Sequence, residues 1–460
     1  MVTRVGVNNL RLVRELTFDP IRDDEPRMWT VILAENGHCK TSILQAIAMS
    51  LSGGVIANQF RDVASLRGIR RADPLELAVV GMFTTSVEGA DSFFGCGGKV
   101  QQDSRHWEAR GTLFLEAQAA FTEKAEHFAR SAKGSPEHLT LAREVLTLHE
   151  QRKIIPTLRD TNTPGHLVVA YGVNRVLPLA GTTAFPDNPA RQRVSSLLTG
   201  EPVIGTDFVR HLTASRPELV QPYLDALNTV IRDPELLPEL GEFMRAGDGA
   251  ERTPEGLRHH HRVTLKAGGE DVVLPATWLS QGYQSLLSVV ADIIGQAYWD
   301  QKRAIPLDEI KGVALIDELD LHVHPKWQVR LVPALKRLLP KMQFIVTTHS
   351  PLVLTGLLPD EIVRLVMDEH GDVVLAPQGP APALMTATAL LAEYFGVTDT
   401  YPHELGKAMA RLGYLIGDPG RSPKEEKELR RLLATLAEHG VDPGWEPVPI
   451  DPELQRRDAP

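Results

Sequence analysis

The dipeptide Lys40-Thr41 has the clearest chemical potential in this sequence. It lies in LAENGHCKTSIL, residues 33–44, which follows the phosphate-binding pattern G-x-x-x-x-G-K-[ST] except that Ala34 and Cys39 replace its two glycines. In such a loop the lysine ammonium would contact the β- and γ-phosphates of a nucleotide, and the threonine hydroxyl would contact Mg²⁺. The pattern therefore predicts a nucleotide site, with an ordinary strand–helix turn as the alternative.

The sequence around this loop favours the nucleotide site. The apolar run Met28–Leu33 predicts a buried parallel strand, and residues 43–51 place apolar side chains on one helical face. A turn between such a strand and helix directs backbone N–H groups and a helix N-terminus at an anion. Ser42 could reach the α-phosphate. The residues that would form this cradle are Asn36, Gly37, His38, Cys39, Lys40, Thr41 and Ser42.

The two missing glycines matter because the cradle alternates the sign of φ. A non-glycine residue held at φ > 0 costs about 1–3 kcal/mol. That cost is small beside a charge-assisted network on a phosphate, and Gly37 is retained. We therefore expect Ala34 and Cys39 to make a strained variant of the loop that still binds nucleotide, but more weakly.

Two other apolar runs end in residues suited to phosphoryl transfer. In GVALIDELD the run Val313–Ile316 ends in Asp317-Glu318, where Asp317 would hold Mg²⁺ through water and Glu318 would polarise the attacking water. The run 343–347 precedes His349, and the carboxyl ends of parallel strands are where ligands bind in open α/β sheets. The alternatives are a surface strand end that carries acids and a structural histidine.

A second anion site is predicted at LSQG, residues 279–282, which opens a long apolar helix. Ser280 would supply a hydroxyl, and Gly282 would let the backbone come close to a phosphate. One chain would then have two phosphate-binding ends far apart in sequence. The simplest resolution is that they face different nucleotides across a dimer.

These four motifs, in this order, resemble those of ABC-type ATPase heads, most closely the SMC-like, RecF-like and overcoming-lysogenization-defect branch. The resemblance implies that ATP and Mg²⁺ are the cofactors and that Thr41 and Asp317 are the metal ligands. It also implies roles for the motifs: Walker A at 34–42, signature at 279–282, Walker B at Asp317-Glu318, switch histidine at His349 and D-loop region at Asp320.

The strand and loop VAYGVNR, residues 169–175, resemble a recurring feature of bacterial defence ATPases, among them Septu-type and retron-associated systems. The chain departs from the wider pattern at Tyr283, where many relatives carry an acidic residue. It also has no glutamine at an identifiable Q-loop position, and Asn174 and Arg175 are candidate substitutes.

Composition indicates an ordinary globular protein, because 43% of the 460 residues are hydrophobic and 23% are charged. Two cysteines give no disulfide framework and favour a reducing, cytoplasmic compartment. We expect neither a signal peptide nor a membrane span. The net charge of −10 argues against a general nucleic-acid coat. It leaves a local basic patch at Arg67, Arg70 and Arg71, for which a solvated helix face is the favoured alternative.

The expected fold is α/β: an ABC-type P-loop ATPase head with a mixed or parallel sheet, a helical insertion lobe and a helical C-terminal tail. We expect four regions: an ATPase lobe at 1–116, a mainly helical insertion at 117–260 with one core strand near 166–172, a second ATPase lobe at 261–385, and a helical region at 386–460.

More local patterns predict hairpins at 2–18 and 262–275, strand-like runs at 75–86 and 106–117 around a glycine-rich loop at 95–98, and proline-broken helices over 188–248.

The resemblance implies an ATP-driven switch that dimerises, or forms a higher homo-oligomer, by sandwiching ATP. It also implies a role in anti-phage defence. No long heptad repeat and no nuclease residue set is evident, so we expect a separate effector, such as a nuclease. Direct nucleic-acid binding is not evident. The alternatives are a weakly hydrolysing nucleotide-binding scaffold and a RecF-like DNA repair ATPase.

Overall fold

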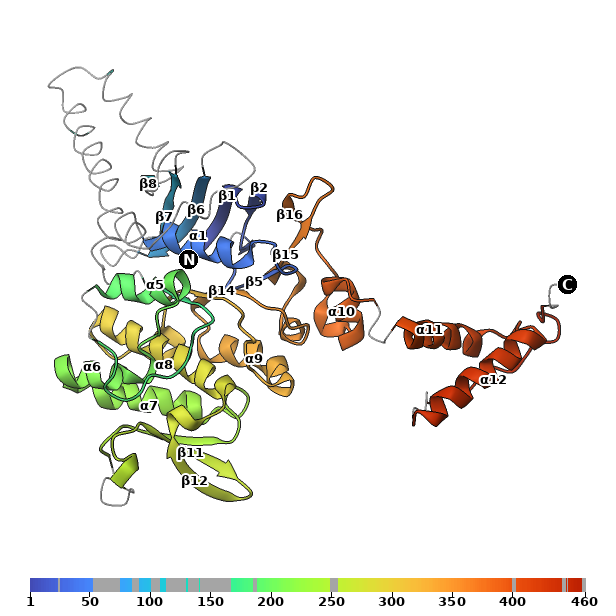
Figure 1. Ribbon diagram of the computed structural model, residues 1–460. Helices are drawn as coiled ribbons and strands as arrows, with labels where there is room; N and C mark the ends of the chain where they lie inside the picture. The colour runs from blue at the N-terminus through green and yellow to red at the C-terminus, as the bar shows by residue number, and fades with distance from the viewer. Residues whose placement is uncertain are drawn as a thin grey trace. The chain divides into compact units, whose positions relative to one another are not determined.

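A computed structural model describes most of the chain (Figure 1). The residues outside the description are 24, 53–74, 85–90, 101–107, 113–129, 131–139, 141–166, 185–187, 249–254, 399–402, 441–443, 445 and 457–460. The chain divides into two compact units, residues 1–390 and 391–460. The predicted helices at 117–158 fall almost wholly, and the predicted basic patch at Arg67, Arg70 and Arg71 wholly, outside the described residues.

The first unit is built on a six-stranded sheet in the order β16-β15-β5-β14-β13-β9. Its strands are β5 (Trp29–Leu33), β9 (Val168–Tyr171), β13 (Gly312–Ile316), β14 (Met342–Thr347), β15 (Ile362–Met367) and β16 (Val373–Leu375). Five are parallel, and β16 pairs antiparallel with β15. The apolar runs predicted at 28–33, near 166–172, at 313–316 and at 343–347 are therefore confirmed as neighbouring strands, buried as parallel strands are.

An antiparallel sheet lies on one side of helix α1 (Lys40–Ser52). Its order is β2-β1-β6-β7-β8, with strands β1 (Val2–Leu10), β2 (Val13–Phe18), β6 (Leu75–Thr84), β7 (Asp91–Val100) and β8 (Glu108–Thr112). Nearly every residue of α1 is buried, because the helix packs against strands of both sheets. The prediction of a glycine-rich loop at 95–98 is wrong, because these residues lie in β7, which pairs with β6 on one side and β8 on the other.

The other face of the parallel sheet is covered by helices (Figure 1). They are α8 (Gln281–Gln301) and α9 (Pro325–Leu338), with α6 (Phe208–Ser215) and α7 (Val220–Ile231) packed on α8, whereas α5 (Pro189–Thr199) packs against β9 and α1. Helix α8 is buried along most of its length, which explains why its sequence is apolar on several faces.

A small antiparallel sheet, β10-β11-β12, follows α7. Its strands are β10 (Leu240–Met244), β11 (Arg262–Ala267) and β12 (Glu270–Pro275). The hairpin predicted at 262–275 is confirmed, with Gly268 and Gly269 at positive φ in its turn. The prediction of helix through 240–244 is wrong, because this segment pairs with β11 instead.

The remaining short elements of the first unit are the β3 (Ile21–Arg22) and β4 (Glu25–Pro26) pair and single 3₁₀ turns. The turns are η2 (Gly205–Asp207), η3 (Pro217–Leu219), η5 (Glu255–Leu257), η6 (Ala276–Trp278), η7 (Leu307–Glu309), η8 (Val353–Gly356), η9 (Pro359–Glu361) and η10 (Pro382–Leu384).

Helix α10 (Ala387–Phe395) spans the boundary, and the second unit continues with α11 (His403–Gly417) and α12 (Pro423–Glu438). Ser422 caps α12 and forms a reciprocal capping box with Glu425. A small apolar core joins the last two helices through Leu412, Leu415, Ile416, Leu429 and Leu436. The helical C-terminal tail is thus confirmed, whereas the four region boundaries stay predictions. Among the described helices, none has the length and apolar character needed to cross a bilayer.

Candidate active site

The sheet order brings the predicted motifs to one edge. Strand β14 lies between β5 and β13, and β9 lies beyond β13, all running in the same direction. The loops that follow these four strands contain residues 34–39, 317–318, 348–349 and 172–175. Their carboxyl ends therefore form the edge at which ligands bind in open parallel sheets.

The loop after β5 has the backbone that a phosphate cradle requires at two positions. Gly37 has φ +84° and Cys39 has φ +66°, so the cysteine is held in the left-handed region that favours glycine. The strain expected at Cys39 is confirmed. The prediction that Ala34 is strained is wrong, because Ala34 does not have a positive φ.

The other cradle residues differ in exposure. Asn36, Gly37 and Thr41 are exposed, His38 is half-buried, and Cys39, Lys40 and Ser42 are buried.

Lys40 lies folded against its own loop. Its Nζ donates to the carbonyl oxygens of Ala34 at 2.8 Å and Glu35 at 3.0 Å, which holds the cradle closed on the lysine stem. Burial lowers the pKa of Lys40, and the nearby carboxylates of Asp317 and Glu318 oppose that shift. The ammonium group thus lies between the loop and the two acids of the second motif.

The Thr41 hydroxyl joins the first motif to the second. It donates to Asp317 Oδ2 at 2.8 Å, although the two residues are 276 positions apart. Thr347, the last residue of β14, donates from its hydroxyl to Asp317 Oδ1 at 2.7 Å, and Thr347 Oγ1 itself accepts from the Glu318 N–H at 2.7 Å. Each carboxylate oxygen of Asp317 is thereby held in place, and a hydroxyl and a carboxylate suited to a hard divalent cation converge.

Glu318 and His349 occupy the open part of this edge. Glu318 is half-buried at φ +50°, a backbone conformation that costs about 1–3 kcal/mol for a non-glycine residue. His349 is exposed. Asp320 accepts a hydrogen bond from the Thr348 hydroxyl and another from the His349 N–H at 3.3 Å, so it fixes the turn that presents the histidine.

Arg175, which follows β9, is also part of this edge, and its side chain is buried. Its Nη1 donates to the Asp317 carbonyl at 2.8 Å, its Nη2 donates to the Glu318 carbonyl at 2.6 Å, and its Nε donates to Ser285 Oγ at 3.0 Å. The sequence singled out Arg175 only as a substitute for a missing glutamine. Its charge and its place after a buried strand were the available signal.

The signature residues lie at the start of α8. Ser280 is the exposed N-cap residue, and its side chain makes no capping hydrogen bond. Gly282 is buried against the loop after β13: a Cβ added there would lie 2.5 Å from the His322 carbonyl oxygen. Across the described parts of the chain, no hydrogen bond or ion pair joins Ser280 or Gly282 to residues 34–42. The structure therefore places residues 34–42, Asp317-Glu318 and His349 at one edge of the sheet, and among the described residues Ser280 has no polar contact with residues 34–42.

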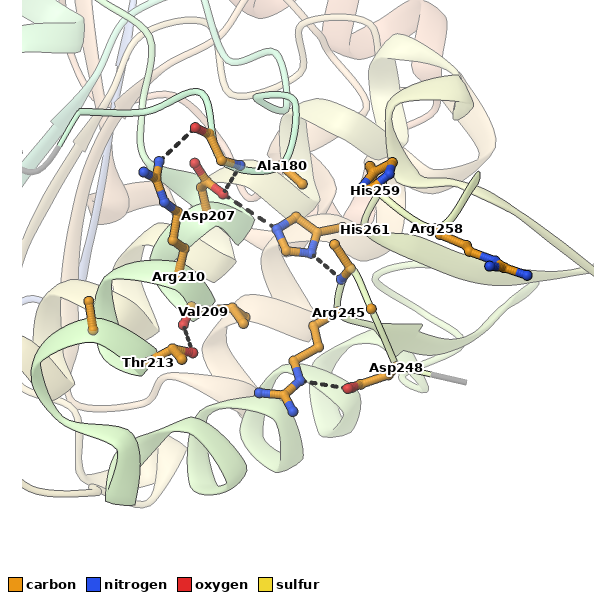
Figure 2. A pocket seen from close by; sticks show the side chains of 14 residues that line it. Ala180, Asp207, Val209, Arg210, Thr213, Arg245, Asp248, Arg258, His259 and His261 are labelled. Carbon is orange, nitrogen blue, oxygen red and sulfur yellow. Dashed lines mark hydrogen bonds and ion pairs between the residues drawn. The ribbon is translucent and has the colours of Figure 1, made fainter. Parts of the chain in front are cut away.

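A pocket of about 730 Å³ lies elsewhere, between η2, α6 and β10–β11 (Figure 2). Asp207 at its base accepts from the Gly181 N–H at 2.8 Å and the Thr183 hydroxyl at 2.6 Å, and His261 Nε2 lies 3.5 Å away. Although burial raises the pKa of Asp207, bonds from His261 and Gly181 outweigh it and hold that pKa well below its usual range. His261 Nδ1 accepts from the Ala246 N–H, so the ring links the segment before β11 to the loop after β10.

No group of three or more histidine, cysteine or acidic residues in the described portion has the arrangement of a metal site. His322 is at φ +64°, and His324 caps α9 by accepting from the Lys326 N–H.

Comparison with known proteins shows that the chain is similar to an AAA domain family and to Septu and retron proteins. Residues 193–355 match the family described as AAA domain, putative AbiEii toxin, Type IV TA system. The chain is 32% identical over 162 residues to a Septu protein PtuA of Bacillus mycoides, covering 35% of this chain and 22% of that protein. It is 31% identical over 189 residues to the Retron Ec83 probable ATPase of Escherichia coli, covering 41% and 33%. The Retron Vc95 probable ATPase of Vibrio cholerae is 40% identical over 112 residues, covering 24% and 20%.

These matches confirm the resemblance to Septu-type and retron-associated ATPases. The aligned segments span only about a fifth to a third of the length of these curated relatives. Among solved structures, the fold is similar to an SMC head bound to the C-winged helix domain of ScpA, with a TM-score of 0.46, 14% identity, and coverage of 83% of this chain and 99% of that one. The SMC head domain from Thermotoga maritima gives a TM-score of 0.41 at 13% identity, covering 82% and 99%.

Proposed function

We propose that this chain is an ABC-type ATPase that binds ATP with Mg²⁺ and hydrolyses it as a switch. The observation that carries the proposal is the 2.8 Å hydrogen bond between the Thr41 hydroxyl and the Asp317 carboxylate. This contact brings the helix end of a phosphate loop against the acid at the end of a neighbouring strand. That is the pairing of groups which holds Mg²⁺ in P-loop NTPases.

Each residue at this edge has a role in the proposed reaction. Thr41 and Asp317 supply oxygen ligands to Mg²⁺, which when bound would neutralise charge on the β- and γ-phosphate oxygens. Lys40 leaves the carbonyls of its own loop and pairs with the same phosphates. Glu318 accepts a proton from the attacking water, and His349 contacts the γ-phosphate from the next loop.

The backbone N–H groups of residues 36–42 would complete the phosphate cradle at the start of α1.

We propose further that two chains share each nucleotide. Ser280 is exposed at the start of α8 and makes no capping bond, so its hydroxyl is available to an anion. Since it has no polar contact with residues 34–42 of its own chain, it would serve the nucleotide of a second copy. ATP would then join two heads into a homodimer or larger assembly, and loss of the γ-phosphate would release them.

Single and mixed variants test this arrangement. Lys40→Ala should abolish ATP binding in calorimetry, whereas Glu318→Gln should bind ATP, fail to hydrolyse it and accumulate as a dimer in light scattering. Ser280→Arg should bind ATP but neither dimerise nor turn over.

Mixing Lys40→Ala with Ser280→Arg should restore one intact composite site per heterodimer and with it part of the ATPase activity. Normal ATP binding by Lys40→Ala would refute the loop assignment. A crosslink from Ser280 to the nucleotide of its own chain would refute the shared site.

We also propose that the ATPase acts in the cytoplasm in anti-phage defence, with a separate effector such as a nuclease. The similarity to Septu and retron proteins supports this role. The purified chain should therefore cut neither DNA nor RNA with any divalent metal. Protection against phage should require a gene for that effector beside the gene for this chain, and should be lost in Glu318→Gln. Metal-dependent cleavage by the chain alone would contradict the need for a partner.

A further inference from the structure

We infer that Arg175 is a positioning residue that couples helix α8, which begins at the signature residues, to the geometry of Glu318. The inference rests on the proposed ATPase function. It starts from the three elements that one guanidinium joins: the loop after β9, the strand end at 317–318, and Ser285 in the second turn of α8.

Arg175 is a costly residue to bury in this way. Its side chain is only 3% exposed, and none of the described acids lies within 4.0 Å of it as an ion pair. Burial lowers the pKa of Arg175 to about 10, and the carboxylates of Asp317, Asp320 and Glu318 oppose the shift, so the group stays charged at neutral pH. A buried cation held mainly by two carbonyl oxygens and a hydroxyl contributes little net stability. Its value is therefore in fixing the backbone that it contacts.

The backbone that it fixes is strained. Glu318 has φ +50°, and its peptide groups are held at both ends: its N–H donates to Thr347 Oγ1, and its carbonyl accepts from Arg175 at 2.6 Å. Without the second contact, the strained residue has a lower-energy conformation available. Arg175 thus keeps the Glu318 carboxylate directed toward the edge of the sheet.

The same guanidinium also contacts α8, so its position depends on the position of that helix. Ser285 accepts from its Nε at 3.0 Å, and Gly282, one turn earlier, packs so closely on the His322 carbonyl that no Cβ fits. A movement of the α8 N-terminus therefore displaces the loop 317–322 through both contacts. In the shared-site arrangement, engagement of Ser280 by one nucleotide would adjust Glu318 at the other.

Three variants and one control test the coupling. Arg175→Met removes the guanidinium but keeps a side chain of similar length. Arg175→Lys keeps the positive charge but cannot donate to all three acceptors at once. Ser285→Ala removes only the hydrogen bond to α8. The control Arg191→Met removes a guanidinium near the surface of α5. For each protein we would measure the unfolding midpoint, ATP affinity by calorimetry, and kcat and KM over a range of protein concentration.

Arg175→Met should bind ATP with wild-type affinity, keep its KM, and lose about 100-fold in kcat, the size of loss that a misplacement of about 1 Å causes. Arg175→Lys should recover only part of that loss. Ser285→Ala should bind ATP and lose the rise of turnover with protein concentration that dimerisation gives the wild type. Arg191→Met should match the wild type.

Three results would overturn the inference: wild-type kcat in Arg175→Met, wild-type concentration dependence in Ser285→Ala, or lost ATP binding together with a lowered unfolding midpoint in both Arg175 variants. The last result would show a structural role only. If the wild type itself does not hydrolyse ATP, the proposed function fails, and this inference fails with it.

Discussion

Replacing Cys39 by glycine should make the phosphate loop more stable than replacing it by alanine. Both substitutions remove the thiol, which is 8% exposed and part of the core around α1, so the loss of burial is matched between them. They differ in the strain at φ +66°, which alanine keeps and glycine relieves. A non-glycine residue in the left-handed region costs about 1–2 kcal/mol.

The greater freedom of glycine in the unfolded chain offsets about 0.4–1 kcal/mol of that gain. Cys39→Gly should therefore exceed Cys39→Ala by roughly 0.5–1 kcal/mol, a change of up to about fivefold in the unfolding equilibrium. Urea unfolding followed by fluorescence, with stacked Trp29 and Phe344 just before the loop as part of the reporting core, measures the difference.

In calorimetry Cys39→Gly should bind ATP at least as tightly as the wild type, because the cradle no longer maintains a strained residue. Lys40→Ala provides the non-binding baseline. Equal or greater stability of Cys39→Ala would show that the positive φ carries no cost at this position. Weaker ATP binding by Cys39→Gly would show that the cysteine contributes to the cradle.

Three other outcomes are expected. Gly282→Ala should lower the unfolding free energy by about 1–3 kcal/mol, because its Cβ would meet the His322 carbonyl at 2.5 Å, whereas Gly256→Ala, with open space around it, should be neutral in the same thermal melt. Burial raises the pKa of Asp292 to about 6, against hydrogen bonds from the Gly205 N–H and the Tyr171 hydroxyl, so the folded state binds more protons than the unfolded state and stability should fall as pH rises from about 4 to 6. Asp292→Asn should remove this slope, and a slope that persists would assign it to another group. The Cys39 thiol should react slowly with a maleimide, and more slowly still with ATP bound; labelling that ignores ATP would place the nucleotide elsewhere.

The positions of the motifs were predictable because each sits where a change of pattern is easy to detect. Buried parallel strands are continuous apolar runs, and an acid, a lysine or a histidine directly after one marks its end. The strand at 240–244 was missed because it pairs with a hairpin that comes later in the chain, and no local pattern reveals such a partner. The glycines at 95–98 suggested a loop, but neighbouring strands on both sides override their weak preference for the extended state.

The individual contacts of the site could not be predicted from the sequence, for a different reason. Ala34 and Cys39 occupy equivalent glycine positions of one motif, yet only Cys39 has a positive φ, because the way the loop closes on Lys40 decides which residue bears the strain. Nothing in the sequence distinguishes Thr347 from other strand residues, yet its hydroxyl forms hydrogen bonds with both the Asp317 carboxylate and the Glu318 N–H. Such roles depend on the register of β14 against β13, which pairs Val346 with Ile316.

The order of strands in the central sheet also determines when the site can exist during synthesis. Strand β5 is made early, but both of its hydrogen-bonded neighbours, β14 and β15, are made late: Trp29 pairs with Phe344 and Val31 with Ile362. At about 5–20 residues per second, a ribosome needs tens of seconds to deliver them. Until then the apolar face of β5 has no sheet to join, and chaperones are the expected means of shielding it. In a nascent chain the Thr41 hydroxyl consequently cannot meet Asp317, so the proposed nucleotide site can form only after most of the protein has been translated.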